Sequence, residues 1–300
     1  MRAFLLFVGL LAAALIVAAA LTYPAWLLVS AISVEPVHRV MNRVAMLLAL
    51  IGLIYLTRRL GLSSRAAMGY GLPRREFLRQ LAIGWLCGAA LMIPLAALLL
   101  GLDVRQPKPA LDESLFALFA GGVIAGFAVA FIEETFFRGV LYTAVARTSS
   151  VAAAIVAPSL LYAALHFLGG RLRTPADEVS WAHGFAVLAK LFERYVEPLT
   201  FIDSFLALVM LGVLLSLVRQ RTGAIAGCIG LHAAGVCAIA VLRGATFVDH
   251  SDAQAGLVGA YDGVIGWAAL VWFAAIGVIY MRMSRDSGAS AAGRESATPK

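Results

Sequence analysis

Four ionisable side chains lie inside long apolar stretches of this sequence. Glu133 and Glu134 occur in FIEETFFRG, His166 in LLYAALHF, and His232 in TGAIAGCIGLHAAGV. Ionisable groups inside lipid cost a few kcal/mol each, so they usually mark a functional site. A carboxylate can act as a general base on water, and an imidazole can donate to a developing oxyanion. The chemistry that these residue types favour is therefore hydrolysis.

The composition indicates that lipid surrounds most of the chain. Of 300 residues, 62% are hydrophobic and 14% are charged, and the mean hydropathy is +0.90. A soluble domain is usually about half apolar and about a quarter charged. A span needs roughly 20 mostly apolar residues. The sequence therefore predicts an all-α, polytopic membrane helix bundle with about eight transmembrane helices, near residues 3–22, 40–57, 81–101, 115–146, 150–169, 200–218, 223–242 and 263–281.

Basic residues in the connections predict the topology. The net charge is +7, and the arginines flank apolar runs, which favours contact with anionic lipid over nucleic acid. Segments 61–80 and 170–199 mix charged and apolar residues and are expected at the membrane interface. With eight spans, the larger share of the basic residues collects on the side of both termini, which are therefore expected in the cytoplasm. The first apolar run is interpreted as an uncleaved span, and the composition favours a bacterial inner membrane.

Three separate helices bring the polar groups to similar depths. At 1.5 Å of rise per residue, Glu134, His166 and His232 lie roughly 20, 24 and 15 Å from the cytoplasmic side. A shared intramembrane site is the simplest explanation, although polar groups that only hold helices together are the alternative. Four residues separate Glu134 from Arg138, so the two can pair on one α-helical face. Glu133 is rotated about 100° away and is left for chemistry.

These residues resemble the motifs of the CPBP intramembrane protease family, which includes CaaX-type prenyl proteases and the Abi proteins. The family motif EExxxR is present as Glu133 to Arg138, and FxxxH appears as Tyr162 to His166 with a change of the first aromatic residue. A third His follows a Thr-Gly turn two helices later, here as His232. The resemblance covers about residues 115–240.

Domain organisation follows from this resemblance. We expect N-terminal transmembrane helices with the basic interfacial segment over residues 1–114 and a CPBP-like catalytic helical core over 115–245. A final transmembrane helix over 246–283 and a disordered polar tail over 284–300 complete the expected organisation.

The resemblance implies an intramembrane endopeptidase with a glutamate-activated water. In this interpretation Glu133, His166 and His232 are catalytic, whereas Glu134, Arg138 and Tyr162 support them. One position departs from the family pattern, because Val236 stands where an Asn normally assists the second His at the oxyanion. Either His232 acts alone, or Asp203 or Ser204 substitutes, or activity is reduced.

Other cofactors and functions stay open at this point. No cofactor is expected, and zinc held by Glu133, His166 and His232 is the alternative, although HExxH is absent. The expected partners are the lipid bilayer and a membrane-bound protein or peptide substrate, with no nucleic acid. A catalytically silent scaffold or regulator is the second function class, and a proton-coupled transporter is the third.

Overall fold

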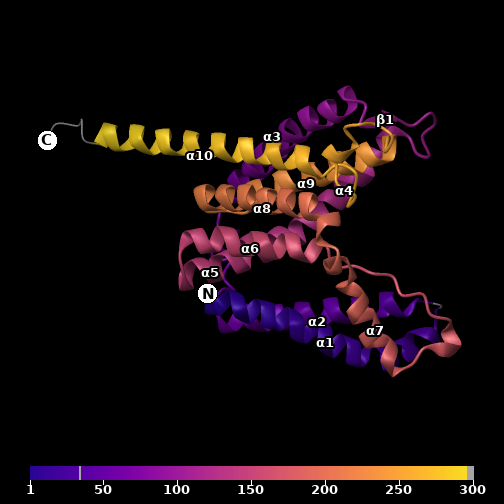
Figure 1. The fold of residues 1–300 in the computed structure, drawn as a ribbon. Helices are drawn as coiled ribbons and strands as arrows, with labels where there is room; N and C mark the ends of the chain where they lie inside the picture. Colours follow the sequence, from indigo (N-terminus) through magenta and orange to yellow (C-terminus); the bar gives the residue numbers. More distant parts are fainter. Residues whose placement is uncertain (34, 296–300) are drawn as a thin grey trace. The chain divides into compact units, whose positions relative to one another are not determined.

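The computed structural model describes residues 1–33 and 35–295, and the side chains of the last helix as far as Met283. The predicted all-α class is confirmed, since short strands are rare between the helices (Figure 1). The helices are α1 (Arg2–Ser30), α2 (Val37–Arg59), α3 (Arg74–Gly101), α4 (Leu115–Glu134), α5 (Tyr142–Thr148), α6 (Val151–His166), α7 (Trp181–Leu191), α8 (Ile202–Thr222), α9 (Ala226–Ala245) and α10 (Trp267–Glu295). A π-helical segment, η1 (Thr135–Leu141), joins α4 to α5.

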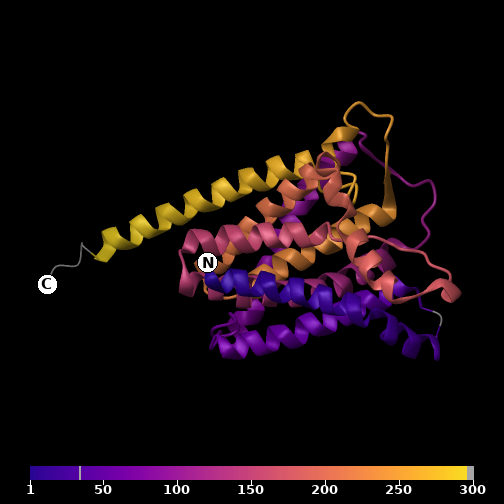
Figure 2. The ribbon, with the colours of Figure 1, turned by 60° about the horizontal axis from the view of Figure 1, so that its bottom comes forward.

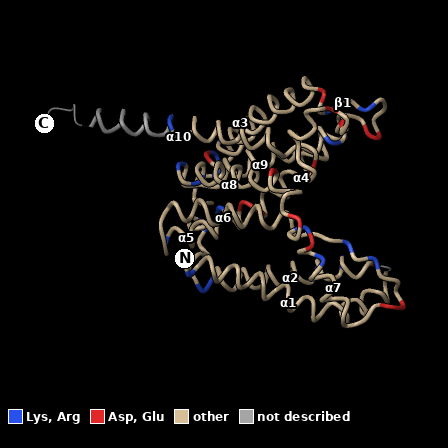
Figure 3. Tube along the Cα trace, in the orientation of Figure 1, with Lys and Arg blue, Asp and Glu red and all other residues tan. Residues whose placement is uncertain are grey.

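Within the described residues, six helices are long and apolar enough to cross a membrane. They are α1, α2, α3, α8, α9 and the continuous stretch Leu115–Thr148. The two other expected spans coincide with shorter apolar helices, Val151–His166 and Trp267–Met283. The protein is therefore an integral membrane helix bundle, whereas the expected count of eight spans is not confirmed. Charged residues gather at helix ends and connections in each part of the chain (Figure 3).

The helices fall into two compact units, and each unit combines two stretches of chain. Unit 1 consists of residues 1–71 and 135–200, and unit 2 of residues 72–134 and 201 onward. The two units group helices that contact one another. The domain ranges expected from the sequence were drawn from its motifs, and those ranges stay predictions.

Helix α9 of unit 2 packs closely against both α3 and α4 (Figures 1 and 2). Glycines allow the approach, because a Cβ at Gly88 of α3 would lie 2.5 Å from the Leu231 carbonyl oxygen of α9. On α4, Gly122 faces Cys237 and Gly126 faces the Ala233 carbonyl. Small residues let helix backbones approach each other in lipid, where packing drives association.

A short antiparallel strand pair lies next to the C-terminal end of α9. Strand β1 (Arg105–Pro107) pairs with β2 (Thr246–Val248). The Arg105 side chain is buried and donates to the Thr246 hydroxyl at 2.7 Å and to the Gly263 carbonyl at 2.6 Å. It therefore ties β1 to the end of α9 and to the loop before α10.

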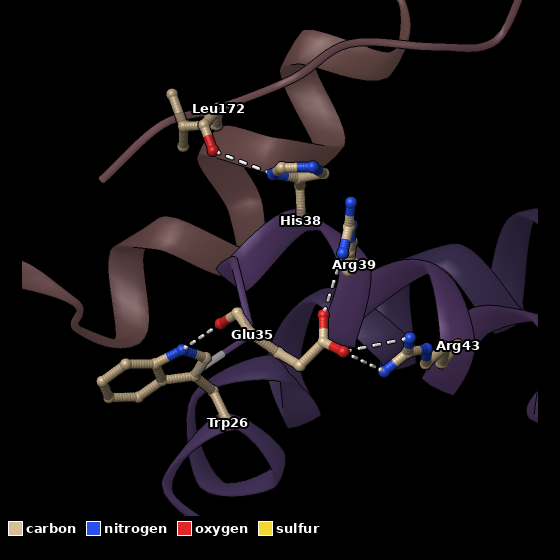
Figure 4. Close-up of polar contacts among 6 residues, drawn as sticks. All are labelled: Trp26, Glu35, His38, Arg39, Arg43 and Leu172. Carbon is tan, nitrogen blue, oxygen red and sulfur yellow. Dashed lines mark hydrogen bonds and ion pairs between the residues drawn. The ribbon is translucent and has the colours of Figure 1, made fainter. Parts of the chain in front are cut away.

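Unit 1 is built on a hairpin of α1 and α2 with α7 packed against both helices. The core between them includes Ala18, Ala19, Met41, Val187 and Leu191. Polar contacts close the end of this hairpin (Figure 4): the Trp26 indole donates to the Glu35 carbonyl at 3.1 Å, and His38 Nδ1 lies 3.0 Å from the Leu172 carbonyl. The Glu35 carboxylate pairs with two arginines of α2, Arg39 and Arg43.

The segments expected at the interface have mixed structures. Segment 61–80 consists of turns followed by the beginning of α3, and segment 170–199 contains α7 and short 3-10 turns. The polar tail was expected to be disordered from residue 284, but α10 continues through residues 284–295. Alanine is the strongest helix former, and several alanines in this stretch favour continuation of the helix. The expectation for residues 296–300 lies outside the described residues.

Candidate active site

Unit 2 brings Glu133 and Glu134 at the end of α4 next to His232 of α9. His232 Nδ1 lies 2.8 Å from Glu134 Oε1, and its Nε2 lies 3.9 Å from Glu133 Oε2. The Glu134 side chain is fully buried and that of His232 is 5% exposed, whereas the Glu133 side chain is 27% exposed. The accessible carboxylate is therefore Glu133, as the sequence predicts for the residue left to chemistry.

The two ring nitrogens of His232 have different surroundings. Nδ1 is within hydrogen-bonding distance of a carboxylate, whereas the 3.9 Å from Nε2 to Glu133 exceeds a direct hydrogen bond. An ionised carboxylate only accepts hydrogen bonds, so Nδ1 then carries the proton of this contact. Nε2 is the nitrogen directed toward the more accessible carboxylate and is the atom suited to contact a substrate.

Unit 1 gathers Arg138, Tyr162 and His166 around the π-helical segment η1. π-Helical turns are rare and often occur at functional sites. The buried Arg138 guanidinium lies 4.8 Å from the Tyr162 ring centre and 5.7 Å from that of Phe137. Cation–π contacts of this kind stabilise a buried cation. The predicted supporting residues Arg138 and Tyr162 are thus in contact with each other.

His166 is held by its own helix. Its Nδ1 lies 2.8 Å from the Tyr162 carbonyl oxygen, which only accepts hydrogen bonds, so Nδ1 is the protonated nitrogen. The Tyr162 and His166 rings lie 4.4 Å apart between centres. In the neutral imidazole, Nε2 therefore keeps its lone pair and can accept a hydrogen bond from water.

Two expected relationships cross from one unit to the other and stay predictions. One is the single site formed by Glu133, His166 and His232. The other is the ion pair between Glu134 and Arg138. The regular α-helix assumed for that pair ends at Glu134, because the chain is π-helical from Thr135.

Asp203 and Ser204, the proposed substitutes for the missing Asn, lie at the start of α8. The Ser204 hydroxyl donates to the Ile265 carbonyl at 2.6 Å. A Cβ at Gly259 would lie 2.8 Å from Asp203 Oδ2. Both side chains thus contact the loop before α10, and the oxyanion role proposed for them stays a prediction.

Tyr195 is a residue of this region that the sequence reasoning missed. Its hydroxyl donates to the Ala164 carbonyl at 2.5 Å, two residues before His166. Partial burial raises the pKa of the Tyr195 phenol, so it stays a protonated donor. Nothing in the sequence of the mixed segment 170–199 singles out Tyr195. Its contact with Ala164 depends on the chain turning back after α6.

Zinc held by Glu133, His166 and His232 stays an alternative, because His166 belongs to unit 1 and the other two residues to unit 2. Over residues 1–33 and 35–295, no three His, Cys, Asp or Glu side chains are placed to hold one metal ion. Nδ1 of His232 is already engaged with Glu134.

A comparison with known protein families matches the part of the chain that contains both groups of candidate site residues, the one in unit 2 and the one in unit 1. Residues 115–238 match the family model described as type II CAAX prenyl endopeptidase Rce1-like. These residues are thus similar to the Rce1-like family. The resemblance to CPBP intramembrane proteases is thereby confirmed, and the match supports an intramembrane CAAX-type protease. No curated protein and no solved structure matches the chain.

The Rce1-like region begins with α4 and ends within α9. It therefore includes Glu133, Glu134, Arg138, His166 and His232. The helices outside it, among them α1, α2, α3 and α10, contribute to the two units without belonging to the matched region.

Proposed function

We propose that the protein is an intramembrane endopeptidase that hydrolyses a peptide bond of a membrane-associated protein or peptide with a water activated by Glu133. The observation that carries the proposal is the placement of His232 Nε2 beside Glu133, the more accessible carboxylate of the pair. A general base and an oxyanion donor on two packed helices are the two groups that peptide hydrolysis needs.

Glu133 acts first on the attacking water. Its carboxylate takes one proton as the water oxygen bonds to the scissile carbonyl carbon. When Nε2 of His232 also carries a proton, it donates to the carbonyl oxygen as negative charge develops there. The carbon–nitrogen bond then breaks, and the proton held by Glu133 passes to the leaving amine.

His166 assists by orienting the water. In this proposal its Nε2 lone pair accepts a hydrogen bond from the water, whose proton goes to Glu133; the contact of Nδ1 with the Tyr162 carbonyl supports this role. Arg138 and Tyr162 hold the turn that follows the two glutamates. If Glu133 and His166 act on one water, the losses in kcat for Glu133→Gln and His166→Ala will be far from additive in the double variant.

The first experiment compares membrane proteomes of cells carrying the wild type, Glu133→Gln or His232→Ala. A substrate is expected as a protein whose processed form disappears in both variants. Glu76→Gln and His250→Ala are matched controls, because Glu76 bonds Arg79 on α3 and His250 is exposed in a loop. Processing that continues in both site variants would overturn the proposal.

A catalytically silent scaffold is the second candidate, and Val236 in place of the family Asn favours it. In that case the abundance or assembly of a partner will depend on the protein, but will not change in Glu133→Gln. A transporter would instead give proton-coupled flux in proteoliposomes. The proposed substrate is a peptide or protein with a C-terminal membrane tag, which rests on family analogy.

A further inference from the structure

One end of unit 1 carries a patch of exposed arginines, whereas the acidic residues described in that unit lie elsewhere. The arginine patch consists of residues from the start of α1, the last turn of α2, the connection after α2 and the last turn of α5: Arg2, Arg58, Arg59, Arg65 and Arg147. The acidic residues lie in the turn between α1 and α2 or in segment 170–199: Glu35, Asp177, Glu178, Glu193 and Glu197. Helix α6, about 24 Å long, separates the end of α5 from that segment.

Hydrogen bonds hold the connection after α2, here called loop 60–71, against α5. Arg147 donates to the Gly61 carbonyl at 3.3 Å, and the Thr143 hydroxyl donates to the Ala67 carbonyl at 2.9 Å. Helix α2 ends with two arginines just before Gly61. The end of α2, loop 60–71 and the end of α5 therefore bring their arginines together on one surface.

The charges of this patch are not offset by carboxylates within the described residues. Arg59 lies over the Tyr55 ring, 5.8 Å from its centre, and Arg147 bonds to a backbone carbonyl. The other arginines of the patch are exposed and make no ion pair in the described part of the chain. Guanidinium groups stay charged, and like charges repel each other, so the patch favours an anion.

The place of the patch in the fold indicates the kind of anion. Helices α1 and α2 are long and apolar enough to cross a membrane, so their ends lie at the level of the lipid headgroups. A guanidinium group matches phosphate oxygens with paired N–H donors. Basic residues beside the membrane attract lipids with a net negative headgroup. An anionic phospholipid therefore fits the patch better than a zwitterionic one, which brings its own cation.

Loop 60–71 also contacts the turn that follows the two candidate catalytic glutamates. The Tyr70 hydroxyl lies 2.5 Å from the Thr135 hydroxyl, and Thr135 is the first residue of η1 after Glu134. The Tyr70 amide donates to the Arg65 carbonyl at 2.8 Å. A ligand that fixes the Arg65 side chain therefore acts on the same short segment that holds Thr135.

We propose that loop 60–71 and Arg147 bind the phosphate of an anionic phospholipid, and that the bound headgroup stabilises the contact of Tyr70 with Thr135. The lipid offsets the repulsion within the patch, so the loop is held more firmly against α5 and η1. Cleavage then depends on the charge of the surrounding lipid. This regulatory part rests on the proposed function, whereas lipid binding and its effect on η1 do not.

Lipid binding is tested by native mass spectrometry of the full-length protein in detergent with added phosphatidylglycerol or phosphatidylcholine. The wild type is expected to retain phosphatidylglycerol in preference. Arg65→Gln/Arg147→Gln should lower that affinity about 30-fold, since each basic residue near an anionic surface contributes roughly fivefold. Arg171→Gln/Arg173→Gln is the matched control, because both arginines are exposed in segment 170–199 of the same unit. Equal loss in the two double variants, or no preference between the lipids, would overturn the proposal.

Two further measurements separate lipid binding from other roles of the arginines. Arg65→Lys/Arg147→Lys keeps both charges and should retain most of the affinity for phosphatidylglycerol. Loss as large as in the Gln pair would mean that the arginines act through folding, which contradicts the proposal. Excess inorganic phosphate should leave phosphatidylglycerol bound, and its displacement would identify a soluble anion as the ligand instead of a lipid.

Hydrogen exchange tests the link to η1 without a substrate. In nanodiscs that contain phosphatidylglycerol, residues 61–71 and 135–141 of the wild type should exchange more slowly than in pure phosphatidylcholine. Tyr70→Phe keeps the ring and removes the hydroxyl, so it should lose the difference at 135–141 and keep it at 61–71. Exchange at 135–141 that ignores the lipid, or that responds equally in Tyr70→Phe, overturns the link.

A cleavage assay in the same two kinds of nanodisc separates this inference from the proposed function. The wild type should cleave faster with phosphatidylglycerol, by roughly fivefold or more for a coupling of ordinary size, and Tyr70→Phe should lose that gain. Equal rates in both lipids would contradict the regulatory part. If the wild type cleaves no substrate in either lipid while the exchange difference persists, the proposed function fails and the lipid site stands.

Discussion

Gly126 of α4 lies directly against the carbonyl oxygen of Ala233, the residue that follows His232 in α9. A Cβ at position 126 would overlap this carbonyl. Because Gly126 precedes Glu134 by two helical turns on the same helix, this close contact sets the spacing of α4 and α9 where the glutamates meet His232. Backbone packing and the geometry of the acid–imidazole pair are therefore coupled.

Gly126→Ala should separate α4 from α9 and weaken the contact between Glu134 and His232. We expect a loss of cleavage of roughly tenfold or more, since small displacements in a catalytic site are costly. Gly121→Ala on the same helix is the matched control, because a Cβ there meets nothing within 4 Å. Equal activity of the two variants in a reconstituted cleavage assay would contradict the coupling.

Val236→Asn should increase cleavage. Position 236 is one helical turn after His232 on the same face of α9, so an amide there adds a second donor toward the oxyanion. The expected gain in kcat is up to about 10²-fold, the size of one oxyanion donor. Val236→Leu controls for volume, and an Asn variant no faster than the Leu variant would speak against His232 as the oxyanion donor.

Chelators should leave the activity unchanged. The proposed reaction uses Glu133 as the base and His232 as the donor, with no step through a metal. Cleavage by protein treated with 1,10-phenanthroline and passed over a desalting column is the measurement. Loss of activity that returns on addition of Zn²⁺ would establish the zinc alternative instead.

Arg105→Ala should destabilise the protein. Arg105 is buried and donates to the Thr246 hydroxyl and to the Gly263 carbonyl, and its removal takes both hydrogen bonds away. Such losses cost roughly 2–3 kcal/mol, which lowers the Tm measured by thermal shift in detergent. Lys108→Ala removes a cation whose partner Asp112 is 94% exposed, and it should change Tm little. Matching Tm values for the two variants would mean that the buried contacts are not stabilising.

Asp262 should make stability fall as pH rises. Burial raises the pKa of its carboxyl above the ordinary value, with Arg243 and Arg105 opposing the shift. The folded state therefore holds this proton more tightly than the unfolded state, so its contribution is full below the ordinary pKa and is lost as pH rises through the raised one.

Asp262→Asn isolates that contribution. The amide oxygen can still accept from the Val264 and Ile265 backbone amides, as Oδ1 does now at 2.9 and 2.7 Å. The variant should give a flatter curve of Tm against pH and be more stable than the wild type at the alkaline end. A slope identical to that of the wild type would rule out Asp262 as its source.

The sequence alone determined the lipid surroundings, the fold class and the candidate catalytic residues. Long apolar runs can be satisfied in lipid only as helices, since helices pair their backbone groups internally. Glu133, Glu134, His166 and His232 were recognisable because ionisable residues in such runs are costly. The motifs around them led to the family that the comparison confirms for residues 115–238.

Only the tertiary structure decided which side chains contact each other. Helical periodicity relates residues within one helix, and from it we predicted the pairing of Glu134 with Arg138, which stays a prediction. The contact of Glu134 with His232 depends on the packing of α4 against α9, which periodicity does not report. The π-helical turn after Glu134 could not be predicted from the sequence either, because a widened turn leaves the pattern of apolar and polar residues unchanged. In the sequence Arg105 lies in a polar connection and shows no sign of burial. Its hydrogen bond to Thr246 depends on the pairing of β1 with β2 beside the end of α9.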